Sequence, residues 1–215
     1  GLKFKTGIFT NLSHDHLDYH ETFDDYLKSK LSLFEKLLKK NGNIITDMEI
    51  PQYRRIKEVA IKNQLKIETI SNKNGDLEII SHEYQNEKQI VQVKYNKNIY
   101  KFETSLIGKI QIKNILMAII AATKSNLNFK KIINTIDNLK SVSGRLEQIG
   151  IIKNNSKVIL DYAHTPGALE ASLKSLKEQF KNKNISIVFG CGGNRDKAKR
   201  PMMGKIANQY CDRVY

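Results

Sequence analysis

Residues 157–166 read Lys157-Val158-Ile159-Leu160-Asp161-Tyr162-Ala163-His164-Thr165-Pro166. The run 157–161 predicts a strand, and Pro166 suits the first turn of a helix that we expect over 166–181. The same alternation then repeats, with a strand predicted over 185–190 and a helix over 201–210. Strands that alternate with helices in this way predict an open, parallel α/β sheet.

Two loops leave these strands at their carboxyl ends, where open α/β sheets bind ligands. In the first loop, Asp161 and His164 could contact a ribose and a base or phosphate, although a strand-end turn explains them almost as well. The second loop, 190–201, is rich in glycine and carries the basic residues Arg195, Lys197, Lys199 and Arg200. Backbone amides and cations together suit a phosphate or carboxylate, and a tight turn with exposed basic side chains is an equal alternative.

The segment ahead of this pattern ends at a break over 141–144 and mixes strands with helices. Apolar periodicity predicts strands at 7–10, from Ile44, and at 77–81, 90–95 and 98–103. It predicts helices over 22–40, from Pro51 to about Asn63, over 111–124 and over 128–140. Thr22 and Asp25 have the spacing of an N-terminal capping pair.

Lys30 is the unusual residue of the predicted helix 22–40, because it lies on the apolar arc with Leu27, Leu31 and Phe34. A lysine that faces a core is costly unless its charge is removed or paired. Burial lowers the pKa of an amine and makes it nucleophilic, so Lys30 is a candidate for chemistry. The alternative is that its amine reaches out to solvent.

A polar loop just upstream carries five candidate metal ligands, His14, Asp15, His16, Asp18 and His20. Zinc favours nitrogen and sulfur ligands, whereas magnesium favours oxygens. The mixed loop fits neither preference fully, and surface histidines in a polar turn are the alternative.

Composition sets broad limits on function. The 215 residues carry a formal net charge of +14. This charge allows nucleic acid, anionic membranes or phosphorylated substrates as partners, but the lysines are spread along the whole chain rather than gathered in one run. No apolar run is long enough to cross a membrane. The two cysteines, Cys191 and Cys211, form no disulfide framework, which suits a reducing cytoplasm.

The order of several segments carries a stronger signal than any one of them. These segments are 10–20, Lys30, 143–147, 161–166 and 189–197. Together they closely resemble the Mur ligase family, and within it the UDP-N-acetylmuramoyl-tripeptide synthetases, along essentially the whole chain. The resemblance implies that residues 1–142 are the latter part of a central P-loop-type ATPase domain. Residues 143–215 would then be the start of a Rossmann-like open-sheet C-terminal domain.

The resemblance also implies a cytoplasmic enzyme of peptidoglycan synthesis that acts as a monomer, inserts in no membrane and binds no nucleic acid. Such enzymes use ATP to form an acyl-phosphate on a UDP-linked muramoyl dipeptide, which meso-diaminopimelate or L-lysine then attacks to give an amide. The residues do not choose between these two diamino acids. The rival interpretations are another Mur-family or folylpolyglutamate-type ligase and, from a different class, a basic nucleic-acid-binding module.

The family's site residues map onto this chain one by one. The lysine that matches Lys30 is carbamylated by CO₂ and helps to hold a magnesium ion, with the histidine that matches His16 as a further ligand. Arg195 matches the arginine that grips the carboxylate of the incoming amino acid, and Lys197 would act in catalysis by reaching phosphate. The positions that bind the nucleotide, or lie beside it, are Asn114 at the adenine, then Arg145, Asp161 and His164.

Two departures from the family pattern bear on the expected function. Ile110-Gln111 stands where Phe-Asn is usual, which alters part of the expected nucleotide contact. The phosphate-binding loop, the N-terminal uridine-binding domain and the segment that selects the amino acid are absent from these residues. We therefore expect the 215 residues to be a piece of a longer protein and to have no ligase activity alone.

Overall fold

The computed structural model describes residues 1–12, 22–192 and 199–215. These residues form two compact units. The first contains Gly1–Glu83, Ile90–Glu103 and Ile110–Asp137, and the second contains Tyr84–Gln89, Thr104–Lys109 and Asn138–Tyr215. The long segment of the second unit begins near the predicted domain boundary at 142–143, which itself stays a prediction.

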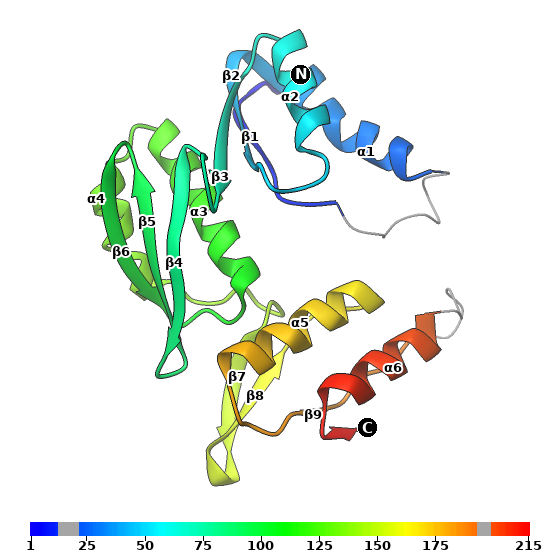
Figure 1. Cartoon of the computed structure of the whole chain (residues 1–215). Helices are drawn as coiled ribbons and strands as arrows, with labels where there is room; N and C mark the ends of the chain where they lie inside the picture. Colours follow the sequence, from blue (N-terminus) through cyan, green and yellow to red (C-terminus); the bar gives the residue numbers. More distant parts are fainter. Residues whose placement is uncertain (13–21, 193–198) are drawn as a thin grey trace. The chain divides into compact units, whose positions relative to one another are not determined.

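Six strands form one sheet in the order β1-β2-β3-β4-β5-β6 (Figure 1). They are β1 Phe4–Phe9, β2 Leu38–Asp47, β3 Lys66–Ser71, β4 Leu77–Gln85, β5 Lys88–Tyr95 and β6 Asn98–Thr104. The pairs β1/β2, β2/β3 and β3/β4 are parallel. Two-residue turns at 86–87 and 96–97, all with positive φ, join the last three strands as hairpins. The predicted strands at 77–81, 90–95 and 98–103 are therefore confirmed.

The helical elements of the first unit are α1 Phe23–Ser32, a π-helical turn Leu33–Leu37, α2 Tyr53–Lys62, α3 Lys109–Lys124, α4 Phe129–Ile133 and a 3₁₀ turn Ile136–Asn138. Side chains of α1 and α2 join those of β1 and β2 in one apolar core that includes Phe9, Leu31, Phe34, Ile44 and Ile56. Burying such side chains is the main favourable term in folding. The core therefore holds α1, and with it Lys30, against the carboxyl end of β1.

The helix that carries Lys30 begins as the sequence predicts and ends earlier. Thr22 caps it, because the amide of Asp25 donates to Oγ1 of Thr22 at 3.1 Å. Leu38 leaves the helix in an extended conformation and pairs with Phe4 of β1, so 38–40 belong to β2 rather than to the predicted helix. Gly7 of β1 makes this packing possible, since a Cβ there would lie only 2.9 Å from the Phe34 ring.

The second unit contains β7 Glu147–Ile152, a 3₁₀ turn Lys153–Asn155, β8 Ser156–Leu160, α5 Pro166–Gln179, β9 Ser186–Ile187, α6 Lys199–Tyr210 and β10 Arg213–Val214. The predicted strand at 157–161 and both predicted helices are present. The pairing of β9 with β10 is parallel as expected, whereas β8 pairs antiparallel with β7, a strand that was not predicted. The predicted strand 185–190 is shortened to two residues.

Leu169 and Leu173 of α5 pack against Met203 of α6, and the partly buried Ile185 and Ile187 lie beside them. Thr165 caps α5, because its Oγ1 accepts from the amide of Ala168 at 3.2 Å. Pro166 stands in the first turn, as the sequence predicts. Within the described parts of the chain, no helix is long and apolar enough to cross a membrane.

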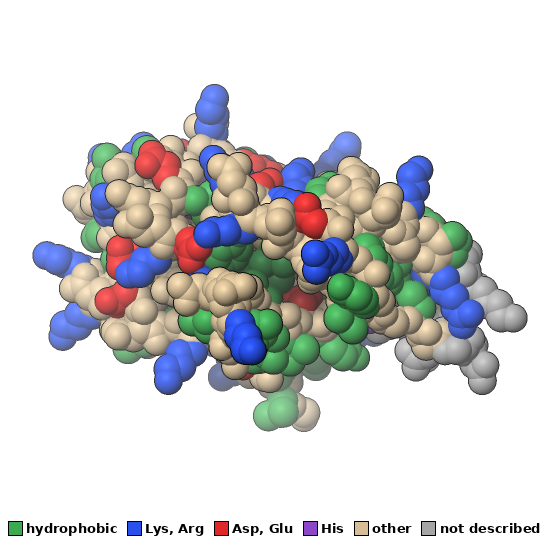
Figure 2. Space-filling view, turned by 90° about the horizontal axis from the view of Figure 1, so that it is seen from below, with side chains coloured by type: hydrophobic (Ala, Val, Ile, Leu, Met, Phe, Trp, Pro, Cys, Tyr) green, Lys and Arg blue, Asp and Glu red, His purple; other side chains and the backbone are tan. Residues whose placement is uncertain are grey.

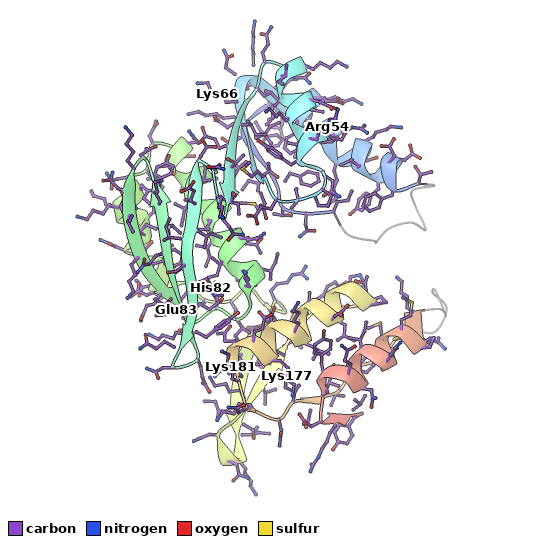
Figure 3. All side chains as sticks on the ribbon, in the orientation of Figure 1. Arg54, Lys66, His82, Glu83, Lys177 and Lys181 are labelled. Atoms are coloured by element: carbon purple, nitrogen blue, oxygen red, sulfur yellow. The ribbon has the colours of Figure 1, made fainter. Side chains whose placement is uncertain are left out.

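Asp212 ties the start of β9 to α5. Its Oδ2 accepts from the amide of Ile185 at 2.7 Å and lies 3.3 Å from Nζ of Lys177, a residue labelled in Figure 3. The hydrogen bond from Ile185, and then the Lys177 ammonium, lower the pKa of Asp212 below its ordinary value of 3.8.

A pH dependence follows from this lowered pKa. A carboxyl whose folded pKa lies below its unfolded pKa stabilises the fold above the unfolded value, and this stabilisation is lost as pH falls through the folded value. We therefore expect the thermal-unfolding midpoint of Asp212→Asn to lie below that of the wild type above pH 3.8, and the two midpoints to converge at lower pH. A difference that stays constant down to strong acid would contradict this assignment.

Candidate active site

Lys30 lies at a hollow between the end of β1 and α1. Its Nζ is 3.4 Å from the carbonyl oxygen of Asn11, 5.1 Å from the ring centre of Tyr26 and 5.9 Å from that of Phe9. The side chain is half-buried, so it neither enters the apolar core nor projects freely into solvent. The hollow has a volume of about 320 Å³ and is also lined by Ser29 and Thr10. Lys30 is therefore the basic side chain of a recess that is lined by both polar and apolar residues.

The hollow fits the predicted carbamate in its chemistry. A carbamate on the Lys30 amine would add two oxygens beside the Asn11 carbonyl, and oxygen is the ligand atom that magnesium prefers. The candidate metal ligands of the upstream loop, His14, Asp15, His16, Asp18 and His20, lie outside the described residues. Across residues 1–12, 22–192 and 199–215, no group of three or more His, Cys, Asp or Glu side chains could hold a metal.

The carboxyl ends of β2 and β3 carry a polar network that connects them to α3. The carboxylate of Asp47, which is 1% exposed, forms an ion pair with Lys113 and accepts from the amide of Glu49 at 2.9 Å. Oε2 of Glu49 lies 3.7 Å from the same ammonium. Glu49 also accepts from the Asn72 amide at 2.8 Å, and this hydrogen bond is the main cause that lowers the pKa of Glu49. One lysine thus holds two carboxylates at the strand ends.

Sequence reasoning missed Lys113, although the signal that singled out Lys30 was present there too. Lys113, Met117, Ile120 and Lys124 follow the spacing of one helical stripe. Met117 and Ile120 are buried, so the stripe faces the sheet and carries a lysine at each end. A cation on a buried stripe needs a partner. The acidic residue at the end of the apolar strand β2, Asp47, is that partner.

Asn114, the predicted adenine contact, lies next to Lys113 on α3. Its side chain is exposed, and its Nδ2 donates to Oε1 of Gln111 at 3.4 Å. Gln111 belongs to the Ile110-Gln111 pair, where the family resemblance leads one to expect Phe-Asn. Because it stands one turn before Asn114, its amide can help to orient the Asn114 amide.

In the second unit, Asp161 is the centre of the turn after β8. Oδ2 accepts from the amide of Leu146 at 2.8 Å, and Oδ1 accepts from the amide of Ala163 at 3.0 Å and from Oγ of Ser172 at 2.9 Å. Asp161 therefore links the start of β7, the turn and α5. These contacts favour a scaffolding role for its carboxylate.

Near the same turn, Arg145 and His164 both contact the ring of Tyr162. The Arg145 guanidinium lies 5.4 Å from the centre of the Tyr162 ring, and the His164 ring lies 5.0 Å from it at an edge-on angle. Gly144 enables this arrangement with φ +68°, and its carbonyl accepts from the Tyr162 amide at 2.8 Å. Both Arg145 and His164 are exposed. The structure thus gathers three predicted site residues, Arg145, Asp161 and His164, around one turn.

The glycine-rich loop is described only at its two ends. Cys191 packs with its Sγ 3.6 Å from Sδ of Met203, and Nη2 of Arg200 donates to the carbonyl of Gly192 at 3.4 Å. The predicted site residues Arg195 and Lys197 lie outside the described residues. Their assignments therefore stay predictions.

Basic side chains are scattered over the face of the molecule in Figure 2 and are interrupted by acidic, polar and apolar ones. Several of the described lysines form ion pairs, among them Lys28 with Asp24 and Lys94 with Glu78. Nucleic-acid surfaces instead gather their cations along one stripe or patch. The face in view therefore gives no support to the nucleic-acid-binding alternative.

Comparison with known proteins gives two family matches along the chain. Residues 1–122 match the Mur ligase middle domain. Residues 144–215 match the Mur ligase glutamate ligase domain. The two matches follow one another without overlap, in the order expected from the sequence.

Individual relatives agree with these matches. The chain is 38% identical over 214 residues to a UDP-N-acetylmuramoyl-L-alanyl-D-glutamate–2,6-diaminopimelate ligase of Rickettsia conorii, covering 99% of this chain and 44% of the relative. A solved structure of a ligase with the same name is 30% identical, with a TM-score of 0.73, and the match covers 98% of this chain and 43% of that one. The structure of a MurF ligase from Thermotoga maritima in complex with ADP is 20% identical, with a TM-score of 0.79, over 99% of this chain and 48% of that one. The last comparison concerns the fold alone. The chain thus spans less than half the length of these proteins.

Proposed function

The chain belongs to the Mur ligase family, and from this premise we propose that the protein that carries it is a cytoplasmic, ATP-dependent amide ligase of peptidoglycan synthesis. Its substrate would be UDP-N-acetylmuramoyl-L-alanyl-D-glutamate, to which it adds a diamino acid. The observation that carries the proposal is the 38% identity to a ligase of that name along 99% of the chain. Because the chain covers 44% of that relative, the activity is assigned to the whole protein.

The reaction requires two chemical steps. The terminal phosphoryl group of ATP passes to the glutamate carboxylate and gives an acyl-phosphate with release of ADP. The amine of the diamino acid then attacks the acyl carbon, a proton leaves the amine, and phosphate departs as the amide forms. Catalysis of this kind depends mainly on positioning and on neutralising charge at the phosphoryl group.

The residues of this chain would divide these tasks. Carbamylated Lys30 and His16 would hold a magnesium ion, which neutralises phosphate charge when it is bound. Arg195 would grip the carboxylate of the diamino acid, and Lys197 would reach phosphate. The nucleotide would contact a further group of residues: Asn114 at the adenine, then Arg145, Asp161 and His164.

We propose meso-diaminopimelate, rather than L-lysine, as the added amino acid. The residues of this chain do not choose between the two. The names of the similar proteins from Rickettsia conorii and Chelativorans, at 38% and 36% identity, favour diaminopimelate. We further propose that the two Mur ligase domains meet at residues 142–143 and that the enzyme acts as a monomer. The family matches to 1–122 and 144–215 support this boundary.

Turnover by the purified full-length protein tests the function. We expect ADP release to need both the UDP-linked dipeptide and a diamino acid, and mass spectrometry to find the dipeptide lengthened by one diaminopimelate. Lysine in place of diaminopimelate should give at most about a hundredth of the rate, because a site built to hydrogen-bond a polar group rejects an analogue that lacks it. ADP release without the dipeptide, or equal rates with both amino acids, would contradict the respective part of the proposal.

A further inference from the structure

Two consecutive residues of α3 point in different directions. Lys113 faces the sheet and pairs with Asp47, whereas Asn114 is exposed. They share one helical turn, so a small rotation or shift of α3 moves both side chains together. The direction in which Asn114 presents its amide therefore depends on how the first half of α3 is held against the strands.

The ion pair of Lys113 with Asp47 is the directional contact between the first half of α3 and the strands. The other side chains that α3 buries are apolar, among them Ile112, Leu116 and Ile120. Apolar burial is not directional, so it resists separation of the helix from the sheet more than it resists rotation. An ion pair with a buried carboxylate needs a defined geometry. Asp47, at 1% exposure, has little freedom to follow a displaced ammonium.

Glu49 and Asn72 connect Lys113 to a second strand as well. Glu49 approaches the Lys113 ammonium from the loop after β2 and is fixed by Asn72, which donates from its backbone at 2.8 Å and from its side chain at 2.7 Å. Lys113 is thus anchored to groups that follow both β2 and β3. The anchor lies at the carboxyl ends of parallel strands, the edge where such sheets bind their ligands.

We propose that Lys113 is a positioning residue for nucleotide binding, because its pair with Asp47 fixes α3 so that Asn114 meets the adenine base. The inference rests on the proposed function, in which Asn114 contacts adenine. Lys113 itself touches no nucleotide in this proposal. Its effect should therefore appear in the affinity for ATP and should pass through Asn114.

The other end of the same stripe offers a matched control. Lys124 closes α3, forms an ion pair with Glu68 of β3, and has the same side-chain exposure as Lys113, 27%. It lies eleven residues beyond Lys113, about three helical turns away from Asn114. If Lys113 served only the stability of the fold, the KM for ATP would change in each variant in step with the loss of its thermal-unfolding midpoint.

The experiment measures kcat and the KM values for ATP and for diaminopimelate in the full-length enzyme. The variants are Lys113→Met and Lys124→Met, each alone and combined with Asn114→Ala. We expect Lys113→Met to raise the KM for ATP about tenfold with little change in kcat or in the KM for diaminopimelate, because a misplaced contact weakens binding of the nucleotide alone. Lys124→Met should leave the KM for ATP unchanged, and Lys113→Met should add nothing further to Asn114→Ala.

Other results would contradict the inference, and they separate it from the proposed adenine contact. Equal rises in KM for ATP in Lys113→Met and Lys124→Met, or effects of Lys113→Met and Asn114→Ala that multiply, would overturn the inference. If Asn114→Ala raises the KM for ATP and Lys113→Met does not, the inference is wrong but the proposed nucleotide site remains. No effect of Asn114→Ala would remove the proposed adenine contact and the inference with it. If Lys113→Met does not fold, Asp47→Asn/Lys113→Met removes the pair without leaving a buried charge and is judged in the same way.

Discussion

Replacing Lys30 with alanine in the full-length enzyme is expected to abolish ligase activity, with a loss of about a thousandfold or more in kcat. In the proposed mechanism, the carbamate on this lysine supplies oxygens to the magnesium ion, and alanine can supply none. The recess of about 320 Å³ beside Lys30 remains after truncation of the side chain. Acetate or another small carboxylate should therefore enter it and restore part of the activity, which a titration of the variant with acetate measures.

Lys28 provides the matched control for this prediction. It lies on the same helix, is exposed and pairs with Asp24 at 2.7 Å on the polar face. Lys28→Ala should lose almost no activity, since exposed ion pairs contribute little, and added acetate should have no effect on it. Activity of Lys30→Ala at the wild-type level would exclude the carbamate role. A loss that acetate cannot reverse would instead point to a packing role for Lys30 beside Phe9 and Tyr26.

The environment of Lys30 shows what could and could not be predicted from the sequence. The helical periodicity correctly placed it on the arc with Leu27, Leu31 and Phe34, three residues that the structure buries. It could not give the direction of the amine, because two of the three contacts described for that amine, Asn11 and Phe9, come from outside the helix, and only Tyr26 belongs to it. Asn11 and Phe9 belong to β1 or directly follow it, about twenty residues upstream.

The same distinction explains the errors in the fold. Hairpins were predictable because their turn residues are local, as at 96–97, where Asn and Lys adopt positive φ. The start of β2 could not be predicted in this way. Leu38 leaves the helical pattern because it pairs with Phe4, which lies 34 residues away in the sequence. The strand β7 was not predicted because it contains Gly150 and most of its residues are exposed. The sequence therefore shows no alternation of apolar and polar residues there. The strand forms by pairing with β8.

Asp161→Ala is expected to cause the largest local loss of stability in the second unit. The change removes three hydrogen bonds at once and leaves the amides of Leu146 and Ala163 without their acceptor. We expect it to lower the free energy of opening at these amides by about 2–3 kcal/mol, since the carboxylate is only partly buried and water can replace some of the bonds. Amide hydrogen exchange at Leu146 and Ala163 measures this free energy directly.

Two smaller changes remove the hydrogen bonds of Asp161 selectively. Ser172→Ala removes only the bond at Oδ1 from α5, and Asp161→Asn can keep Oδ1 while it loses the bond from Leu146. Loss of protection should therefore increase from Ser172→Ala to Asp161→Asn to Asp161→Ala. If Asp161 also contacts the nucleotide, as the family resemblance implies, Asp161→Asn should weaken ATP binding by clearly more than its own loss of protection accounts for, whereas Ser172→Ala should not. If Asp161 only supports the turn, the loss of ATP affinity should follow the loss of protection across all three variants, because Arg145 and His164 are carried by the same turn.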